Sequence, residues 1–369
     1  MDRVLFANQL RGIAVFFVLI AHWGGVYWFD REVLTTYTFA PVESMATPAY
    51  IPWLAPPTLN YGTLGVAIFF LISGFVIPFS IRNTQSLSFL RARALRIYPT
   101  YLAASACMLA VAWASSRYWG THFFMDPSRL ISNLLLINND IAQPTIDLVN
   151  WTLSVEIKFY IVAALMAGAL RSANVNALIM LSVFIVAFCE WYPHDLDRIP
   201  LFGGHKLSVD NLRWQLMLII YMFIGTCFYF LHSKMISVKE ATTFIIILFG
   251  LFYICLPHTS FMNKPTVYNF IYGLIIFLGC FLLRSKFRPS RILDFMARIS
   301  YPVYATHSII GYSTLRFLSS NGIPYLISLI IAFSLIVALS YALHLWIETP
   351  SITFAKRYTR KITSPVPAL

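Results

Sequence analysis

Long apolar runs alternate with short polar segments along the whole chain. A helix that crosses a lipid bilayer needs about 20 largely apolar residues. Ten segments approach that length and character, so the pattern predicts an all-α, polytopic integral membrane protein with about ten transmembrane helices. The predicted helices cover residues 8–28, 62–81, 97–116, 149–170, 175–191, 212–231, 241–257, 266–283, 299–318 and 323–347.

The composition favours a lipid environment. Apolar residues make up 59% of the chain and charged residues 11%, with a mean hydropathy of +0.71, whereas a soluble domain carries about 25% charged residues. The net charge of +12 would favour a nucleic-acid partner in a soluble protein. Here the basic residues cluster in short connections between apolar segments, and no motif that reads nucleic acid occurs. We therefore expect the lipid bilayer, and no nucleic acid, as a partner.

The distribution of Lys and Arg between alternate connections predicts the orientation of the helices. One set of connections, together with both termini, carries 18 basic residues, whereas the opposite set carries 7. Cytoplasmic loops are enriched in Lys and Arg, so the richer set and both termini are predicted to face the cytoplasm. An even number of crossings also requires both termini to lie on the same side of the membrane.

The chain is predicted to form one domain. Its longest connections, residues 29–61, 117–148 and 192–211, lie on the outer side and are too short for a separate soluble domain. We expect a single membrane-embedded domain over residues 1–350 and a short basic cytoplasmic tail over residues 351–369. The five cysteines form no CxxC pair, so neither a disulfide framework nor a metal site is expected.

Three ionisable residues, Arg11, His22 and Glu156, lie within predicted helices, and His22 and Glu156 lie at similar depth. Arg11 and His22 are eleven positions apart, which puts them on one face of a helix about 16 Å apart. An ionisable group this deep in a membrane is costly and indicates function by default. Glu156 lies at the depth of His22, and a carboxylate beside an imidazole is a usual arrangement for a general base. The alternative is that Glu156 pairs with a distant arginine, since Lys158 points to another face of the same helix.

A second group of polar residues is predicted near the cytoplasmic side. It contains Arg11, Arg93 and Arg96, with His307 a few turns into the ninth predicted helix. Three guanidiniums suit a phosphate-rich ligand, because the planar fork binds phosphate through two hydrogen bonds. The alternatives are ordinary anchoring of the arginines at the inner surface and, for His307, a histidine satisfied within the core.

Two further pairs are interpreted as structural from the residues alone. Ser73 and Gly74 lie in the middle of the predicted helix 62–81, where small residues allow helices to pack closely. His344 and Glu348 are four residues apart near the end of the last predicted helix, which favours a local pair.

Six sequence blocks stand out in order along the chain. They are LRGIAVFFVLIAH with Arg11 and His22, GVAIFFLISGF with Ser73, FLRARALRIYPTY with Arg93, Arg96 and Pro99, NWTLSVEIKFY with Trp151, Ser154 and Glu156, ISYPVYATHSII with His307, and IETP with Glu348. Together these blocks resemble the acyltransferase 3 family of integral membrane acyltransferases. Any one block is unspecific, whereas six in order are specific.

The resemblance implies an enzyme of the inner membrane that crosses the bilayer several times. Such an enzyme moves an acyl group, commonly acetyl, from cytoplasmic acyl-CoA to a hydroxyl of an extracytoplasmic or membrane-associated glycan. Acyl-CoA, with acetyl-CoA as the default, would be the donor substrate, with a carbohydrate acceptor and no tightly bound cofactor. We expect the membrane domain to complete the transfer alone, without the appended extracytoplasmic hydrolase-like domain of some members.

The matching positions imply roles for individual residues. His22 would take the proton of the acceptor hydroxyl, or itself carry the acyl group, with Glu156 orienting it. The acyl-CoA phosphates would bind Arg11, Arg93 and Arg96. Supporting or substrate-lining roles would fall to Ser73, Trp151, Ser154, His307 and Glu348. The chain departs from the usual family pattern at Ala67, Ile157, Lys158, Thr306 and Ser308.

A second function class also fits the residues. Buried charges and a basic inner face would serve a transporter or flippase of a glycan or lipid-linked precursor. The sequence shows no paired repeats and no matched helices broken by Gly or Pro, which are typical of such transporters. Transfer of label from acetyl-CoA to an acceptor separates the two classes.

Overall fold

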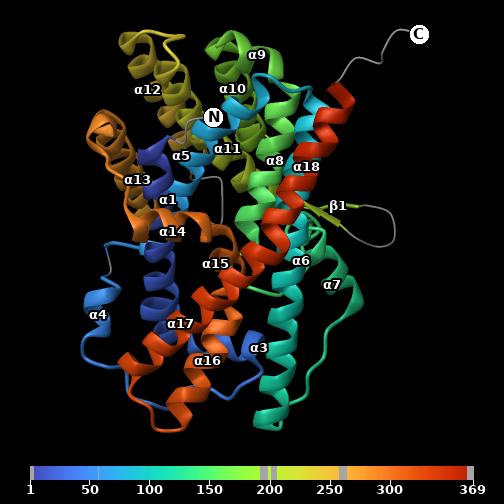
Figure 1. The fold of residues 1–369 in the computed structure, drawn as a ribbon, viewed down its shortest axis with the longest axis vertical. Helices are drawn as coiled ribbons and strands as arrows, with labels where there is room; N and C mark the ends of the chain where they lie inside the picture. The colour runs from blue at the N-terminus through green and yellow to red at the C-terminus, as the bar shows by residue number, and fades with distance from the viewer. Residues whose placement is uncertain (1–3, 57, 192–197, 201–205, 257–263, 364–369) are drawn as a thin grey trace.

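The computed structural model describes residues 4–56, 58–191, 198–200, 206–256 and 264–363, and these residues are mostly helical (Figure 1). Arg3 and residues 364–369, which belong to the predicted cytoplasmic set and tail, lie outside this range. The first elements in chain order are α1 (Leu5–Leu19), the π-helical segment η1 (Ile20–Val26), α2 (Tyr27–Phe29), α3 (Arg31–Thr38), α4 (Ile51–Leu54), α5 (Tyr61–Ile81), α6 (Ser86–Trp119), α7 (Pro127–Leu134), α8 (Trp151–Leu165) and α9 (Ala167–Ser172).

The remaining elements include one short antiparallel hairpin. In chain order they are α10 (Val175–Trp191), β1 (Arg198–Pro200), β2 (Lys206–Ser208), α11 (Val209–His232), α12 (Val238–Cys255), α13 (Lys264–Leu282), the 3₁₀ turn η5 (Arg284–Lys286), α14 (Arg291–Arg298), α15 (Ser300–Thr306), α16 (Ile309–Ser320), α17 (Tyr325–Leu343), the π-helical segment η6 (His344–Glu348) and α18 (Thr349–Thr363).

Each of the ten predicted segments is largely helical, which confirms the all-helical prediction. Within the described residues, six continuous helices are long and apolar enough to cross a bilayer: Leu5–Phe29, Tyr61–Ile81, Ser86–Trp119, Val209–His232, Val238–Cys255 and Tyr325–Arg357. Two further apolar helices, Val175–Trp191 and Thr266–Leu282, are shorter. The other two predicted segments are interrupted, at Met166 between α8 and α9 and at His307–Ser308 between α15 and α16. Ten crossings and cytoplasmic termini stay predictions.

Short elements occupy the connections that the sequence left without structure. Helices α3, α4 and α7 and the β1–β2 hairpin lie in the predicted outer connections, and α14 lies in a predicted inner one. The predicted tail is helical to Thr363, because α17 continues through η6 into α18, which packs against α6.

Helices α5 and α11 form the centre of the molecule. Helix α11 is buried on all sides, as expected for a helix that is apolar around its whole circumference. The two backbones touch at Gly74 and Gly225: a Cβ on Gly74 would lie 1.9 Å from the Met222 carbonyl oxygen. Gly74 therefore provides the close helix packing predicted for the Ser73–Gly74 pair.

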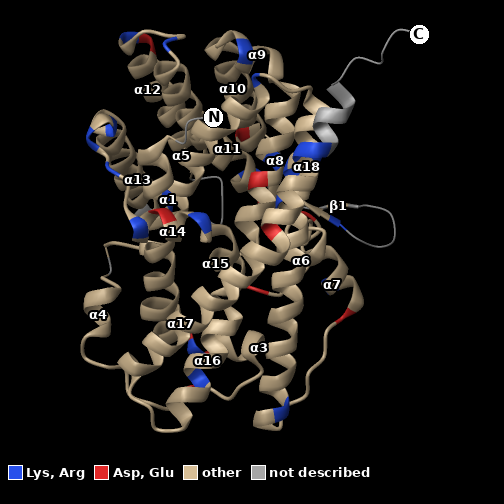
Figure 2. Ribbon diagram, viewed as in Figure 1, with Lys and Arg blue, Asp and Glu red and all other residues tan. Residues whose placement is uncertain are grey.

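The basic residues are distributed unevenly along the long axis of the molecule. In Figure 1, α9 and α12 lie toward one end, and α3, α4 and α16 lie toward the other. Figure 2 shows many Lys and Arg residues on α9, α12, α13, α14 and α18, with few on α16 and at the far end of α6. This arrangement in space agrees with the charge asymmetry of the connections.

Candidate active site

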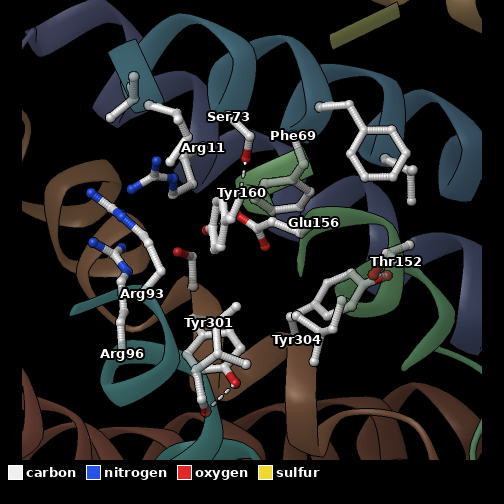
Figure 3. Close-up of a pocket in the computed structure, with 17 residues that line it drawn as sticks. Arg11, Phe69, Ser73, Arg93, Arg96, Thr152, Glu156, Tyr160, Tyr301 and Tyr304 are labelled. Carbon is white, nitrogen blue, oxygen red and sulfur yellow. Dashed lines mark hydrogen bonds between the residues drawn. The ribbon is translucent and has the colours of Figure 1, made fainter. Parts of the chain in front are cut away.

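Helices α1, α5, α6, α8 and α15 enclose a cavity of about 130 Å³, which we call the arginine chamber. Its polar lining residues are Arg11, Ser73, Arg93, Arg96, Thr152, Glu156, Tyr160, Ser300, Tyr301 and Tyr304. Figure 3 shows the three arginines on one side, Glu156 near the middle, and Thr152 with Tyr304 on the opposite side. The structure thus brings together the predicted phosphate-binding residues and Glu156.

The Glu156 carboxylate accepts hydrogen bonds from neutral groups. Ser73 Oγ donates to Glu156 Oε1 at 3.2 Å, and the Tyr160 hydroxyl donates to the same oxygen. Ser73 therefore faces the chamber and acts on Glu156, in addition to the packing that its neighbour Gly74 provides. Lys158 forms its ion pair with Asp140, at 2.8 Å, which confirms that it points away from Glu156.

The three guanidiniums outnumber the carboxylate in the chamber. Arg93 donates to Ser80 Oγ and lies over the rings of Phe89 and Tyr160, at 5.4 and 5.6 Å from their centroids. Its Nε is buried and has no hydrogen-bond partner. Within the part of the chain that the structure describes, Arg11 and Arg96 have neither a hydrogen bond nor an ion pair. The N–H groups of Arg11 and Arg96 are therefore available to an anionic ligand, and the excess positive charge of the chamber favours such a ligand.

A second cavity of about 90 Å³, which we call the histidine chamber, adjoins the first. It is lined by Val18, His22, Gly62, Thr63, Val66, Leu148, Trp151, Thr266, Phe270 and Tyr304. Val66 and Tyr304 line both chambers, so these two side chains form a common wall. His22 lies in the π-helical segment η1, an irregularity that is frequent at functional sites.

The imidazole of His22 is held by Tyr312 of α16 and by His307 at the break between α15 and α16. His22 Nδ1 shares a hydrogen bond with the Tyr312 hydroxyl. The His22 and His307 rings meet edge to face, with centroids 4.7 Å apart and planes at 84°. The His307 Nδ1 lies 2.9 Å from the Tyr304 carbonyl oxygen. A carbonyl only accepts, so His307 carries its proton on Nδ1 and leaves Nε2 as a bare acceptor.

Two predictions about this histidine pair are wrong. Glu156 does not orient His22, because the hydrogen bonds of Glu156 come from Ser73 and Tyr160 and the bond of His22 goes to Tyr312. His307 does not lie with the arginines. Helix α15 begins beside them at Ser300 and Tyr301, and His307 is about two helical turns further along the chain, at the break before α16.

Three predicted supporting residues have different surroundings. Trp151 lines the histidine chamber, and its ring meets that of Trp214 at 5.5 Å. Ser154 lines neither chamber, because it lies in a buried network where Lys158 donates to it at 2.9 Å and it donates to Gln215 at 3.2 Å.

Glu348 also lines neither chamber, since it accepts from His344 at 2.7 Å. The local pairing of His344 and Glu348 is confirmed. For Ser154 and Glu348, which line neither chamber, the supporting or substrate-lining role stays a prediction.

Sequence reasoning missed several tyrosines and threonines of the site, among them Tyr160, Tyr304, Thr152 and Tyr312. Tyr160 lies four residues after Glu156, on the same helix face, and that spacing was a usable signal. Tyr304 lies three residues before His307, within the late block. Thr152 pairs with Tyr304, and Tyr312 reaches His22 from beyond the α15–α16 break, so neither contact leaves a signal in the sequence.

Two carboxyl groups outside the apolar helices have shifted pKa values. Burial raises the pKa of Asp147 to about 6, although the backbone amides of Val149 and Asn150 donate to it. For Glu43, burial raises the pKa, but hydrogen bonds from Ser319, Met45 and Tyr27 and the charge of Arg316 outweigh burial and leave the pKa lowered. Tyr312 lines a small cavity with Glu43, so the partner of His22 reaches this outer cluster.

Comparison with known proteins identifies the family of this arrangement. A family model described as an acyltransferase domain matches residues 4–345, a range that contains five of the six blocks and ends just before IETP, and it confirms the resemblance. "Acyltransferase MdmB" of Streptomyces mycarofaciens is 29% identical over an alignment of 151 residues, which covers 38% of this chain and 37% of that protein. The match thus spans just over a third of the curated relative. No solved structure matches the chain.

Proposed function

We propose, from the premise that this chain belongs to the acyltransferase 3 family and is an acyltransferase, that it is a membrane O-acyltransferase acting between the two sides of the bilayer. The acyl group, acetyl by default, comes from cytoplasmic acyl-CoA. The acceptor is a hydroxyl of an extracytoplasmic or membrane-associated glycan. The inner, cytoplasmic membrane is the proposed location.

One observation carries the proposal: two chambers share a wall, and each holds the chemistry for one substrate. The arginine chamber offers three guanidiniums from α1 and α6, and the adjoining histidine chamber offers His22 from η1. A donor that bears phosphates and an acceptor that bears a hydroxyl would therefore meet at the common wall formed by Val66 and Tyr304.

The arginine chamber is the proposed donor site. The phosphates of CoA suit guanidiniums, because each planar fork binds a phosphate through two charge-assisted hydrogen bonds. The guanidinium N–H groups of Arg11 and Arg96 are hydrogen-bonded to no described residue, and the buried Nε of Arg93 has no hydrogen-bond partner. Anchoring at the inner surface alone does not require three guanidiniums from two helices to line one cavity.

His22 is the proposed general base. In the proposed reaction its Nδ1 carries a proton and donates to Tyr312, so Nε2 is left to take the proton of the acceptor hydroxyl. The hydroxyl oxygen attacks the thioester carbonyl, the new C–O bond forms, and the C–S bond breaks. The CoA thiolate leaves and receives the proton from His22. An acyl group carried on His22 Nε2 would use the same geometry in two steps.

Glu156 is proposed to act on the arginines. It is the carboxylate among the chamber's lining residues, and its charge offsets part of the repulsion between the guanidiniums when the chamber is empty. The hydrogen bonds from Ser73 and Tyr160 hold the carboxylate in this place.

The histidine chamber is the proposed acceptor site. Trp151 presents an aromatic ring beside His22, and a sugar face packs well on such a ring. The predicted outer connections also carry exposed aromatic residues, among them Trp53 and Phe124. These features support a glycan acceptor.

The proposed function is tested by following the acyl group. Purified protein is given acetyl-CoA labelled in the acetyl group, together with surface glycan extracted from a strain deleted for this gene. We expect the labelled acetyl group to appear on the glycan and to be released from it by alkali, because alkali hydrolyses an ester. Movement of the glycan across a vesicle membrane without incorporation of label would instead identify a transporter.

A further inference from the structure

We propose that Val66 and Tyr304 form the passage through which the acyl group reaches His22, and that this passage selects short acyl chains. The inference rests on the proposed function, because it takes the arginine chamber as the donor site and the histidine chamber as the acceptor site. It adds a specificity determinant that lies at neither the arginines nor the base.

The position of the wall within the arginine chamber supports the passage. Figure 3 shows Tyr304 on the side of the chamber opposite Arg11, Arg93 and Arg96. A donor whose phosphates bind the arginines therefore has its thioester directed toward the common wall. Val66 and Tyr304 are the lining residues common to both chambers, so the proposed route from the thioester to His22 passes between them.

The tyrosine side of the passage is held in place from several directions. Thr152 Oγ1 donates to the Tyr304 hydroxyl at 2.8 Å, and that hydroxyl lies 3.4 Å from the Val149 carbonyl oxygen. The Tyr304 ring packs against Phe69, with centroids 5.9 Å apart, and against His307 at 5.7 Å. A ring fixed at both its edge and its hydroxyl cannot swing aside without breaking these contacts.

The valine side is held by close packing of α1 against α5. A Cβ on the neighbouring Gly65 would lie 2.8 Å from Val18 Cγ2 and 3.0 Å from the Ala14 carbonyl oxygen. Val66 itself is only 7% exposed. Helix α5 therefore cannot shift toward α1, and the width of the passage is set by the size of the side chain at position 66.

The chemistry of transfer requires the acyl group to enter this passage. The acceptor oxygen lies beside His22, and the CoA sulfur remains on the arginine side. The carbonyl carbon must contact both atoms while the C–O bond forms and the C–S bond breaks, with the hydroxyl proton passing to His22 and then to the CoA thiolate. The alkyl part of the acyl group is thus confined between Val66 and Tyr304, and each added methylene needs space there.

Substitution at the wall tests the inference. Purified variants are given acetyl-CoA, butyryl-CoA or hexanoyl-CoA with the surface glycan of the deletion strain, and kcat/KM is measured for each donor. For Val66→Ala we expect the butyryl-to-acetyl ratio to rise by roughly tenfold or more, since a methylene-sized change in a pocket alters discrimination by ~10–200-fold. For Val66→Ile we expect acetyl transfer to slow while the Kd for CoA stays at the wild-type value.

The matched control is Val76→Ala, which removes the same two methyl groups from the same helix. Val76 lines the arginine chamber and is not among the residues of the common wall. We expect it to leave the butyryl-to-acetyl ratio unchanged. A second variant, Tyr304→Leu, opens the opposite side of the passage and should shift the ratio in the same direction as Val66→Ala. Wild-type CoA affinity identifies the variants that are folded.

The outcomes separate this inference from the function on which it rests. Wild-type protein that transfers acetyl, together with unchanged ratios in both Val66→Ala and Tyr304→Leu, would overturn the passage and leave the acyltransferase intact. An equal rise of the ratio in Val76→Ala would also overturn it, because chain length would then be set by the whole arginine chamber. Failure of the wild-type protein to transfer acetyl would refute the proposed function itself.

Discussion

Replacement of Tyr312 by phenylalanine isolates the hydrogen bond that holds His22. Tyr312 is fully buried and stacks on Tyr27 with centroids 6.5 Å apart, so phenylalanine retains the ring and its packing. The substitution removes the hydroxyl that bonds to His22 Nδ1. The imidazole then loses the hydrogen-bond partner that sets its orientation.

The expected magnitude follows from the cost of that loss. A hydrogen bond to a charged group contributes about 1.5–3 kcal/mol, and the imidazole becomes charged when it takes the proton in the transition state. At 1.36 kcal/mol for each factor of ten, kcat should fall roughly 10- to 150-fold. The KM for acetyl-CoA should stay within about twofold of wild type, because the arginine chamber is unchanged. Steady-state transfer of labelled acetyl to the glycan, measured over a range of acetyl-CoA concentrations, gives both constants.

The matched control is Tyr101→Phe, which removes a different buried hydroxyl, one that donates to the Asn133 carbonyl oxygen at 2.9 Å. It should lower thermal stability without lowering kcat. A Tyr312→Phe variant with wild-type kcat would refute the orientation of His22 by Tyr312. A fall in kcat that matches that of Tyr101→Phe would reduce the role of Tyr312 to general stability.

Three further predictions concern the arginines, a buried carboxyl and the central helix contact. Arg96→Lys should weaken CoA binding about 10- to 100-fold in calorimetry, because it loses one charge-assisted bidentate contact, whereas Arg291→Lys on α14 should bind as wild type. Burial raises the folded-state pKa of Asp147 from 3.8 to about 6, so stability should fall as pH rises from about 4 to about 6. Asp147→Asn should remove that part of the pH dependence, which amounts to about 3 kcal/mol, as measured by melting at a series of pH values. Gly74→Ala should abolish folding, because its Cβ would lie 1.9 Å from a backbone oxygen of α11, whereas Gly168→Ala has open space and should express normally.

The apolar pattern of the sequence predicted the long helices well and the short ones poorly. A helix of some 20 apolar residues is specified by its own composition, so segments such as α5 and α11 are visible without a structure. Helices α3, α4 and α7 have mixed composition, and packing against the bundle determines them. The π-helical segment η1 around His22 was not predicted, although Gly24 and Gly25 are poor helix formers and mark an irregular stretch of that helix.

The arginine chamber was the more predictable part of the site. Arg11 and Glu156 stand out as charges within predicted apolar helices, and Arg93 and Arg96 share a helix face through their spacing. The pairing of His22 with Glu156 failed for a geometric reason. Depth in the membrane follows from position along a helix, but whether two side chains meet depends on how each helix is rotated about its axis. Those rotations come from contacts such as Gly74 on Gly225, which one sequence does not reveal.

The most direct test of the account is the transfer of labelled acetyl by His22→Ala. Positioned proton transfer contributes about 10²–10⁴-fold to a rate, so the variant should retain no more than about 1% of wild-type transfer to the surface glycan. Its Kd for CoA should be unchanged, and the exposed His122→Ala control should transfer at the wild-type rate. Full transfer by a His22→Ala protein would contradict both the general-base and the acyl-histidine forms of the account.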